Sequence, residues 1–119
     1  MKDTTVQKYW RQAVYKIFNG QCVLCGCPYD LQAHHFIKRR HKVLYNDWRN
    51  GFLLCKECHS TADQLENRDK IIKVMGIEQY NYLCHREKYI LKDYLIERGI
   101  SRKEFNIEQC NELKEIIKG

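Results

Sequence analysis

Two cysteine pairs, each with two residues between its members, constrain this chain more than any other feature of its sequence. Cys22 and Cys25 form the first pair, and Cys55 and Cys58 form the second. A C-x-x-C turn presents both sulfurs to one metal ion, and two such turns complete a tetrahedral structural zinc site. A chain of 119 residues buries only a limited core, so such a site would contribute substantially to its stability.

The other cysteines bear on the class of protein. The total of seven is odd, and the amino terminus has no signal-peptide segment, which together favour an intracellular zinc protein over a secreted disulfide framework. A redox C-x-x-C would need a thioredoxin-like βαβ context that is missing here. Cys27, Cys84 and Cys110 are then spare thiols, although Cys27 is close enough to the first pair to be an alternative ligand.

Hydrophobic periodicity predicts an α+β fold that is mostly α by residue count. An amphipathic helix is expected at 4–18, with Asp3, Thr4 or Thr5 able to cap its start. Apolar segments predict short strands at 31–37 and 52–54, separated by a loop at 38–49 that is rich in Lys, Arg, His and Asn.

The second half of the chain is expected to be helical. One helix should run from Cys58 or His59 to about Val74, a second should span 77–98, and 106–109 resembles a capping box that opens a last helix. No apolar run approaches the roughly 18 residues of a membrane span, so we expect a cytoplasmic protein that does not contact membranes. We divide the chain into an N-terminal helix packed on the core (1–18), a core with zinc knuckles (19–75) and a helical C-terminal extension (76–119).

Positive charge is concentrated in the first part of the chain. Residues 1–50 hold nine Lys and Arg against three Asp, which accounts for the whole net charge of +6. A basic run, Lys38, Arg39, Arg40 and Lys42, lies within this part. Such a distribution suits a polyanionic partner, although a charge run is often only a solvated surface.

Three histidines and an asparagine lie beside the cysteine pairs. His34 and His35 are adjacent on an expected strand, so their side chains point in opposite directions and cannot both bind one ion. One can ligate a metal while the other faces a substrate. Asn50 precedes the next strand, and His59 directly follows Cys58. Metal-assisted hydrolysis requires an ion that stabilises charge on a phosphate and a neutral imidazole that takes a proton from water.

These motifs resemble the HNH endonuclease family, whose core is the ββα-metal fold. The resemblance covers roughly residues 19–75 and runs through Cys22-x-x-Cys25, Ala33-His34-His35-Phe36, Asn50-Gly51-Phe52-Leu53-Leu54-Cys55 and Cys55-x-x-Cys58-His59. It implies that His34 and His59 bind a catalytic ion and that His35 is the general base. It also implies that Asn50 orients the base or touches the metal.

The sequence departs from the family at one position. Many members carry a further His four residues after the position of His59, and this chain has Asp63 there. A carboxylate is an oxygen ligand, which favours Mg²⁺ or Mn²⁺ at that site and leaves Ni²⁺ and Zn²⁺ open. Beside a phosphodiesterase site, the basic run (Lys38, Arg39, Arg40 and Lys42) would contact phosphates.

The resemblance therefore implies a metal-dependent endonuclease that hydrolyses DNA, of the compact kind found in phages or mobile elements. Two readings from other classes stay open: a zinc-binding nucleic-acid module without activity, and a redox or regulatory metal protein that uses Cys27. Charge alone does not separate a DNA substrate from an RNA substrate. The sequence carries no signal for the oligomeric state.

Overall fold

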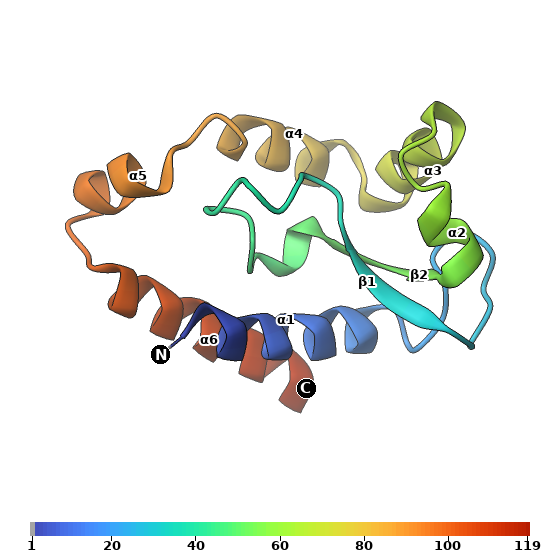
Figure 1. Cartoon of the computed structure of the whole chain (residues 1–119), viewed down its shortest axis with the longest axis horizontal. Helices are drawn as coiled ribbons and strands as arrows, with labels where there is room; N and C mark the ends of the chain where they lie inside the picture. The colour runs from blue at the N-terminus through green and yellow to red at the C-terminus, as the bar shows by residue number, and fades with distance from the viewer. Residues whose placement is uncertain (1) are drawn as a thin grey trace.

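A two-stranded antiparallel sheet lies among helices (Figure 1). The computed structural model describes residues 2–119. Its elements are α1 (Asp3–Ile17), β1 (Leu31–His35), the 3₁₀ helix η1 (Trp48–Asn50), β2 (Gly51–Cys55), α2 (Lys56–Ser60), α3 (Leu65–Met75), α4 (Ile77–Arg86), α5 (Leu91–Arg98) and α6 (Arg102–Lys118). Helices predominate over the two strands across these residues, so the predicted α+β class, mostly α, is confirmed.

The strand β2 is buried on both faces because it lies between two hydrophobic clusters. Its side chains alternate, so Phe52 and Leu54 enter one cluster and Leu53 enters the other. The first cluster includes Ile71 of α3 and Leu83 of α4, and the second joins α1 to α6. Burial on both faces explains why this strand reads as a continuous apolar run.

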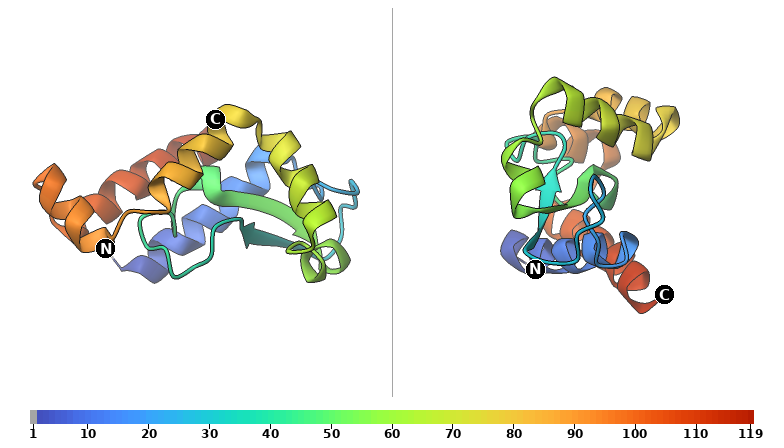
Figure 2. Two further views of the ribbon diagram at one scale, coloured as in Figure 1. Left: turned by 90° about the horizontal axis from the view of Figure 1, so that it is seen from above. Right: turned by 90° about the vertical axis from the view of Figure 1, so that its right-hand side faces the viewer.

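Helix α1 packs directly on the hairpin, at the pair formed by His35 and Gly51. A Cβ atom at Gly51 would lie 2.3 Å from Val14 Cγ2 and 2.8 Å from Trp10 Cζ2, so only glycine allows this approach. Figure 2 shows α1 and α6 running together along one side of the hairpin. The N-terminal helix is therefore in contact with the strand that carries both adjacent histidines.

Two helices that the sequence predicts as continuous are interrupted. The first stops at Ser60 and restarts at Leu65, because Thr61 Oγ1 bonds to backbone carbonyls of α2 and Asn67 Nδ2 donates to the Thr61 carbonyl at 3.1 Å. The segment predicted over 77–98 breaks at 87–90. That turn brings the Tyr89 and Tyr94 rings to a centroid distance of 5.6 Å, a tertiary contact that periodicity does not reveal.

The predicted cap of the first helix and the predicted start of the last helix are also wrong. The N-cap of α1 is Lys2, without a side-chain cap, because Asp3 instead accepts hydrogen bonds from Arg102 and Asn106 of α6. The last helix opens earlier than predicted, through a capping box formed by Ser101 and Glu104. The S-x-x-E pattern was visible in the sequence and is the stronger signal. None of the helices described within 2–119 is long and apolar enough to cross a membrane.

Candidate active site and metal centre

The four paired cysteines converge as the sequence predicts. The sulfurs of Cys22, Cys25, Cys55 and Cys58 all lie within 4.8 Å of one another, and the separation of the Cys25 and Cys55 sulfurs is 3.7 Å. A tetrahedron with metal–sulfur bonds of about 2.3 Å has edges of about 3.8 Å. The cluster therefore fits an ion of the size and geometry of zinc. Cys27 lies outside it, and its sulfur instead approaches the Tyr29 carbonyl at 3.6 Å.

Backbone hydrogen bonds fix the first knuckle against the sheet. The amide of Val23 donates to the Leu53 carbonyl at 2.8 Å, and the amide of Gly26 donates back to the Cys22 carbonyl at 2.8 Å. Gly26, directly after Cys25, has a φ of 78°, a left-handed conformation that glycine adopts without strain. The second knuckle spans the end of β2 and the start of α2. The cluster thus joins the knuckle, the sheet and the helix that carries His59.

The electrostatics of the cluster favour a bound cation. Burial raises the pKa of the Cys22 thiol, but backbone amides of Cys55, Cys25 and Leu24 outweigh burial and bring that pKa down to about 7. Burial, followed by its three neighbouring thiols, raises the pKa of Cys58. Several thiolates this close repel one another, and a divalent cation removes that cost.

His34 and His59 face each other across the gap between β1 and α2. Their ring centroids are 5.2 Å apart in an edge-to-face arrangement, and His34 is buried. Burial, followed by the charge of His59, lowers the pKa of His34 to about 4, and the charge of Asp63 partly opposes this. Neutral imidazoles are the form that ligates metal ions. The geometry brings together the two histidines that the family resemblance implies as ligands of a catalytic ion.

Asp63 is close to this pair but is engaged elsewhere. Its carboxylate accepts a hydrogen bond from Lys38 Nζ at 2.6 Å, and both side chains are exposed. Across residues 2–119 the four cysteines are the only group of three or more His, Cys, Asp or Glu with all ligand atoms within 4.8 Å, so His34, His59 and Asp63 do not form such a group. An exposed ion pair contributes only about 0–1 kcal/mol, so moving this carboxylate to an ion would cost little.

His35 lies on the opposite face of the strand, clamped between two aromatic rings. The Trp10 indole stacks on the imidazole at 4.1 Å with an interplanar angle of 9°, and the Tyr45 ring lies on its other face at 5.3 Å. The imidazole Nε2 is 3.0 Å from the Tyr45 carbonyl oxygen, which can only accept, so Nε2 carries the proton and Nδ1 the lone pair.

The protonation state of His35 suits a base. Burial lowers the pKa of His35 to about 4, although the hydrogen bond to the Tyr45 carbonyl opposes the shift. The charges of Arg39, His34 and Lys42 lower this pKa further. The imidazole is consequently neutral near pH 7, with its orientation set by two rings and one hydrogen bond. Such a group can accept a proton without first losing one.

Asn50 is fully buried and fastens the loop between the strands. Its Oδ1 accepts from the Ile37 amide at 2.7 Å, and its Nδ2 donates to the carbonyls of Ile37 at 3.0 Å and Leu44 at 3.3 Å. These contacts use the amide group to hold the loop that carries Tyr45 and the basic run. Asn50 thus holds in place the loop whose Tyr45 contacts His35.

Replacing Asn50 by Ala should destabilise the protein by about 3 kcal/mol or more, because each buried polar group left unpaired costs about 1–3 kcal/mol. Urea unfolding measures the change as a lower midpoint. Asn111→Ala, at an exposed position of α6, serves as the matched control and should leave the midpoint unchanged. Equal midpoints for the two variants would contradict the role of the Asn50 side chain in holding the loop between the strands.

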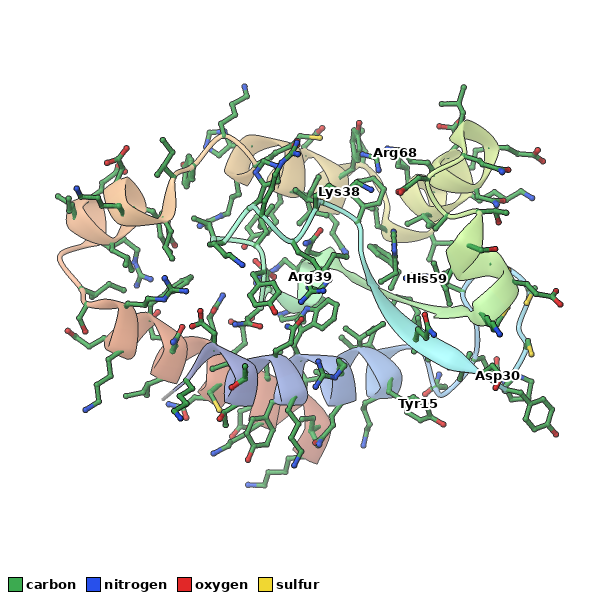
Figure 3. The ribbon with its side chains drawn as sticks, in the orientation of Figure 1. Tyr15, Asp30, Lys38, Arg39, His59 and Arg68 are labelled. Atoms are coloured by element: carbon green, nitrogen blue, oxygen red, sulfur yellow. The ribbon has the colours of Figure 1, made fainter. Side chains whose placement is uncertain are left out.

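The basic run lies against the His35 clamp. Lys42 Nζ lies 4.3 Å from the centroid of the Tyr45 ring, and Arg39 donates to the Tyr45 hydroxyl at 3.3 Å. Arg40 is exposed, and Lys38 pairs with Asp63 as described above. Figure 3 shows Lys38 and Arg39 on the loop, with His59 on the neighbouring helix. The loop thus presents cations next to both candidate histidine sites.

Three residues of the site were missed by sequence reasoning. Trp10 and Tyr45 form the clamp on His35, and Arg68 of α3 lines a cleft of about 340 Å³ together with Lys38 and Asp63. The Arg68 guanidinium lies over the Phe36 ring at 4.0 Å, and its charge lowers the pKa of His34. None of the three belongs to the quoted motifs. The aromatic interleaving of the basic loop by Tyr45 was the one available signal.

Comparison with known proteins agrees with this geometry. Residues 22–64, which are 43 of the 119 in the chain, match the model of the family described as HNH endonuclease. The match confirms the resemblance drawn from the motifs, and its range contains the four cysteines of the cluster together with His34, His35, His59 and Asn50. No match was found among curated proteins or among solved structures. A match to this family at residues 22–64 indicates a nuclease-type function with a nucleic-acid substrate.

Proposed function

We propose that the protein is a metal-dependent endonuclease that hydrolyses phosphodiester bonds of DNA, with His35 as the general base. The observation that carries the proposal is the clamped, neutral His35 on one face of β1, with the His34–His59 pair on the other. The strand therefore supplies both a base and a metal ligand from adjacent residues. The family match at 22–64 supports the same assignment.

In the proposed reaction, Nδ1 of His35 takes a proton from a water molecule, whose oxygen then attacks the phosphorus. The Tyr45 carbonyl accepts a hydrogen bond from Nε2–H and so stabilises the imidazolium that forms. The bond from phosphorus to the 3′ oxygen breaks, which leaves a 5′-phosphate and a 3′ oxygen that takes a proton from solvent water, while His35 returns its proton to solvent. A divalent ion would neutralise charge on the phosphate and the leaving oxygen. We propose Mg²⁺ or Mn²⁺ as this ion, with Ni²⁺ or Zn²⁺ as alternatives. We assign His34 and His59 as its ligands, and Asp63 as a third.

The cysteine cluster has a different role in this proposal. Four thiolates fill the coordination of one zinc ion and leave no open position for a substrate. We therefore assign Cys22, Cys25, Cys55 and Cys58 to a structural Zn²⁺ that sets the distance between β1 and α2. The divisions 1–18, 19–75 and 76–119 remain our proposed units.

A non-catalytic nucleic-acid module is the second candidate, because Asp63 pairs with Lys38 and the described residues present no preformed third ligand beside the two histidines. Supercoiled plasmid and an RNA of matching sequence, each incubated with the protein and Mg²⁺, Mn²⁺, Ni²⁺ or Zn²⁺, separate the candidates. We expect plasmid cleavage with Mg²⁺ or Mn²⁺. If only the RNA were cleaved, the substrate would be RNA rather than DNA. If neither nucleic acid were cleaved with any of the ions, the non-catalytic nucleic-acid module would be favoured.

Replacing Lys38, Arg39 and Arg40 together by Ala should weaken DNA binding and flatten its dependence on salt. The slope of log K against log salt changes by about 0.9 for each phosphate contact, so a loss of up to about 3 is expected. Fluorescence anisotropy of labelled DNA, recorded across a series of salt concentrations, measures this slope. The exposed lysines Lys73, Lys114 and Lys118, replaced together, form the control of equal charge. A slope that falls equally in both triple variants would assign the basic run to bulk electrostatics.

A further inference from the structure

A second group of cations, far from the basic run in sequence, faces that run across a groove. The groove has a volume of about 640 Å³ and is bounded by the loop after β1, the connection between α4 and α5, and the start of α6. Its charged lining consists of Arg40, Lys42, Lys88, Lys92 and Arg102, with Glu87 as the one carboxylate. These cations come from three segments, and Lys88, Lys92 and Arg102 lie outside the family match.

Most of these cations are not neutralised within the protein. Arg40, Lys42, Lys88 and Lys92 are exposed, and none of them occurs in the ion pairs found for residues 2–119. Arg102 pairs with Asp3, and Glu87 lies 3.8 Å from His41. The groove therefore carries a local excess of positive charge, although residues 51–119 are neutral as a whole. Such an excess attracts a polyanion.

The groove connects physically to the proposed base. Lys42 on its wall has Nζ 4.3 Å from the centroid of the Tyr45 ring, and that ring stacks on His35. Two side-chain contacts thus link the groove to the imidazole. In Figure 2 (left) the α4–α5 connection runs beside the loop that carries Lys42. A nucleic-acid backbone bound at His35 would continue along this wall.

The aromatic content of the groove indicates contact with a backbone rather than with unpaired bases. Single strands are bound by stacking bases on free aromatic faces. Tyr89, which lines the groove, already contacts the rings of His85 and Tyr94 at centroid distances of 5.3 and 5.6 Å. Besides the apolar Ile90, Leu91 and Leu95, the groups of the groove that can recognise a polyanion are therefore its exposed cations.

We propose that this groove binds the phosphates of duplex DNA that flank the scissile bond, with Lys88 and Lys92 as the contacts supplied by the C-terminal extension. The proposal rests on the proposed nuclease function and extends its substrate footprint beyond the HNH domain. Residues 76–119 then contribute to substrate binding as well as to packing.

The test is the salt dependence of binding to a labelled, blunt DNA duplex, measured with the whole chain and no added divalent ion so that the duplex stays intact. Lys88→Gln with Lys92→Gln should lower the slope of log K against log salt by about 2. Lys114→Gln with Lys118→Gln, at exposed positions of α6 outside the groove, should leave the slope unchanged.

If the Lys88 and Lys92 variant kept the wild-type salt slope while the wild-type protein still cleaved DNA, the proposal that the groove binds DNA would be overturned. The proposed nuclease function would not be affected. If the wild-type protein bound no DNA duplex, both the proposed groove and the proposed nuclease function would be overturned. The same measurement is made with an RNA duplex of the same sequence. If the Lys88 and Lys92 substitutions lowered the salt slope for the RNA duplex but not for the DNA duplex, the assignment to DNA would be contradicted.

Discussion

Replacing His35 by Ala or by Gln should reduce DNA cleavage by about 10²- to 10⁴-fold, the usual contribution of a positioned general base. The loss follows because neither side chain can take a proton from water. The Gln variant keeps a donor for the Tyr45 carbonyl and fills part of the space between the Trp10 and Tyr45 rings. Plasmid cleavage under single-turnover conditions measures the rate, and thermal melting reports whether the fold survives.

His85→Ala is the matched control for this prediction. His85 is an exposed histidine that contacts Tyr89 and lies outside the HNH match. We expect wild-type cleavage from that variant. Wild-type cleavage by the His35→Gln protein would remove the proposed base. A loss of zinc or of cooperative melting in both His35 variants would instead make the residue structural.

Replacing Cys55 or Cys58 by Ser should abolish cooperative unfolding. Structural zinc binding is worth about 10–16 kcal/mol in small zinc domains, which equals or exceeds the whole stability of about 5–15 kcal/mol of a typical domain. Cys55 ends β2 and is buried, so its replacement also removes the sulfur that faces Cys25 of the first knuckle from the end of the sheet. Calorimetry and zinc content, measured on the same preparations, check the expectation.

Cys27→Ser and Cys84→Ser provide the controls, because both thiols lie outside the cluster. Each variant should melt as the wild type does and keep its zinc. A Cys27 variant that loses zinc as the Cys55 variant does would make Cys27 a ligand and support the redox or regulatory alternative. Normal melting of the Cys55 variant would contradict the structural role of the cluster.

The sequence predicted the local parts of the site well because their signals are local. The spacing of the cysteine pairs sets which sulfurs can meet, and the alternation of a strand places His34 and His35 on opposite faces. The opening helix and both strands lie close to their predicted ranges. These features depend on a few neighbouring residues and on the geometry of one element.

The missed features depend on contacts between distant segments. Trp10 reaches His35 only because α1 packs on the bare backbone of Gly51. The Tyr45 ring can stack on His35 because hydrogen bonds from Asn50 hold the loop that carries Tyr45. The break at 87–90 places Lys88 and Lys92 in one groove with Arg40 and Lys42 of the basic loop, about fifty residues earlier in the chain. Hydrophobic periodicity carries no information about such pairings.

The central claim is that the ion used in cleavage is separate from the zinc of the cysteine cluster. It is tested most directly by plasmid cleavage in EDTA, followed by an excess of Mg²⁺ or Mn²⁺, with zinc content determined in each sample. We predict that EDTA stops cleavage while zinc content and melting stay constant, and that either ion restores the activity. Cleavage that continues in EDTA, or that disappears only as zinc is lost, would contradict the account.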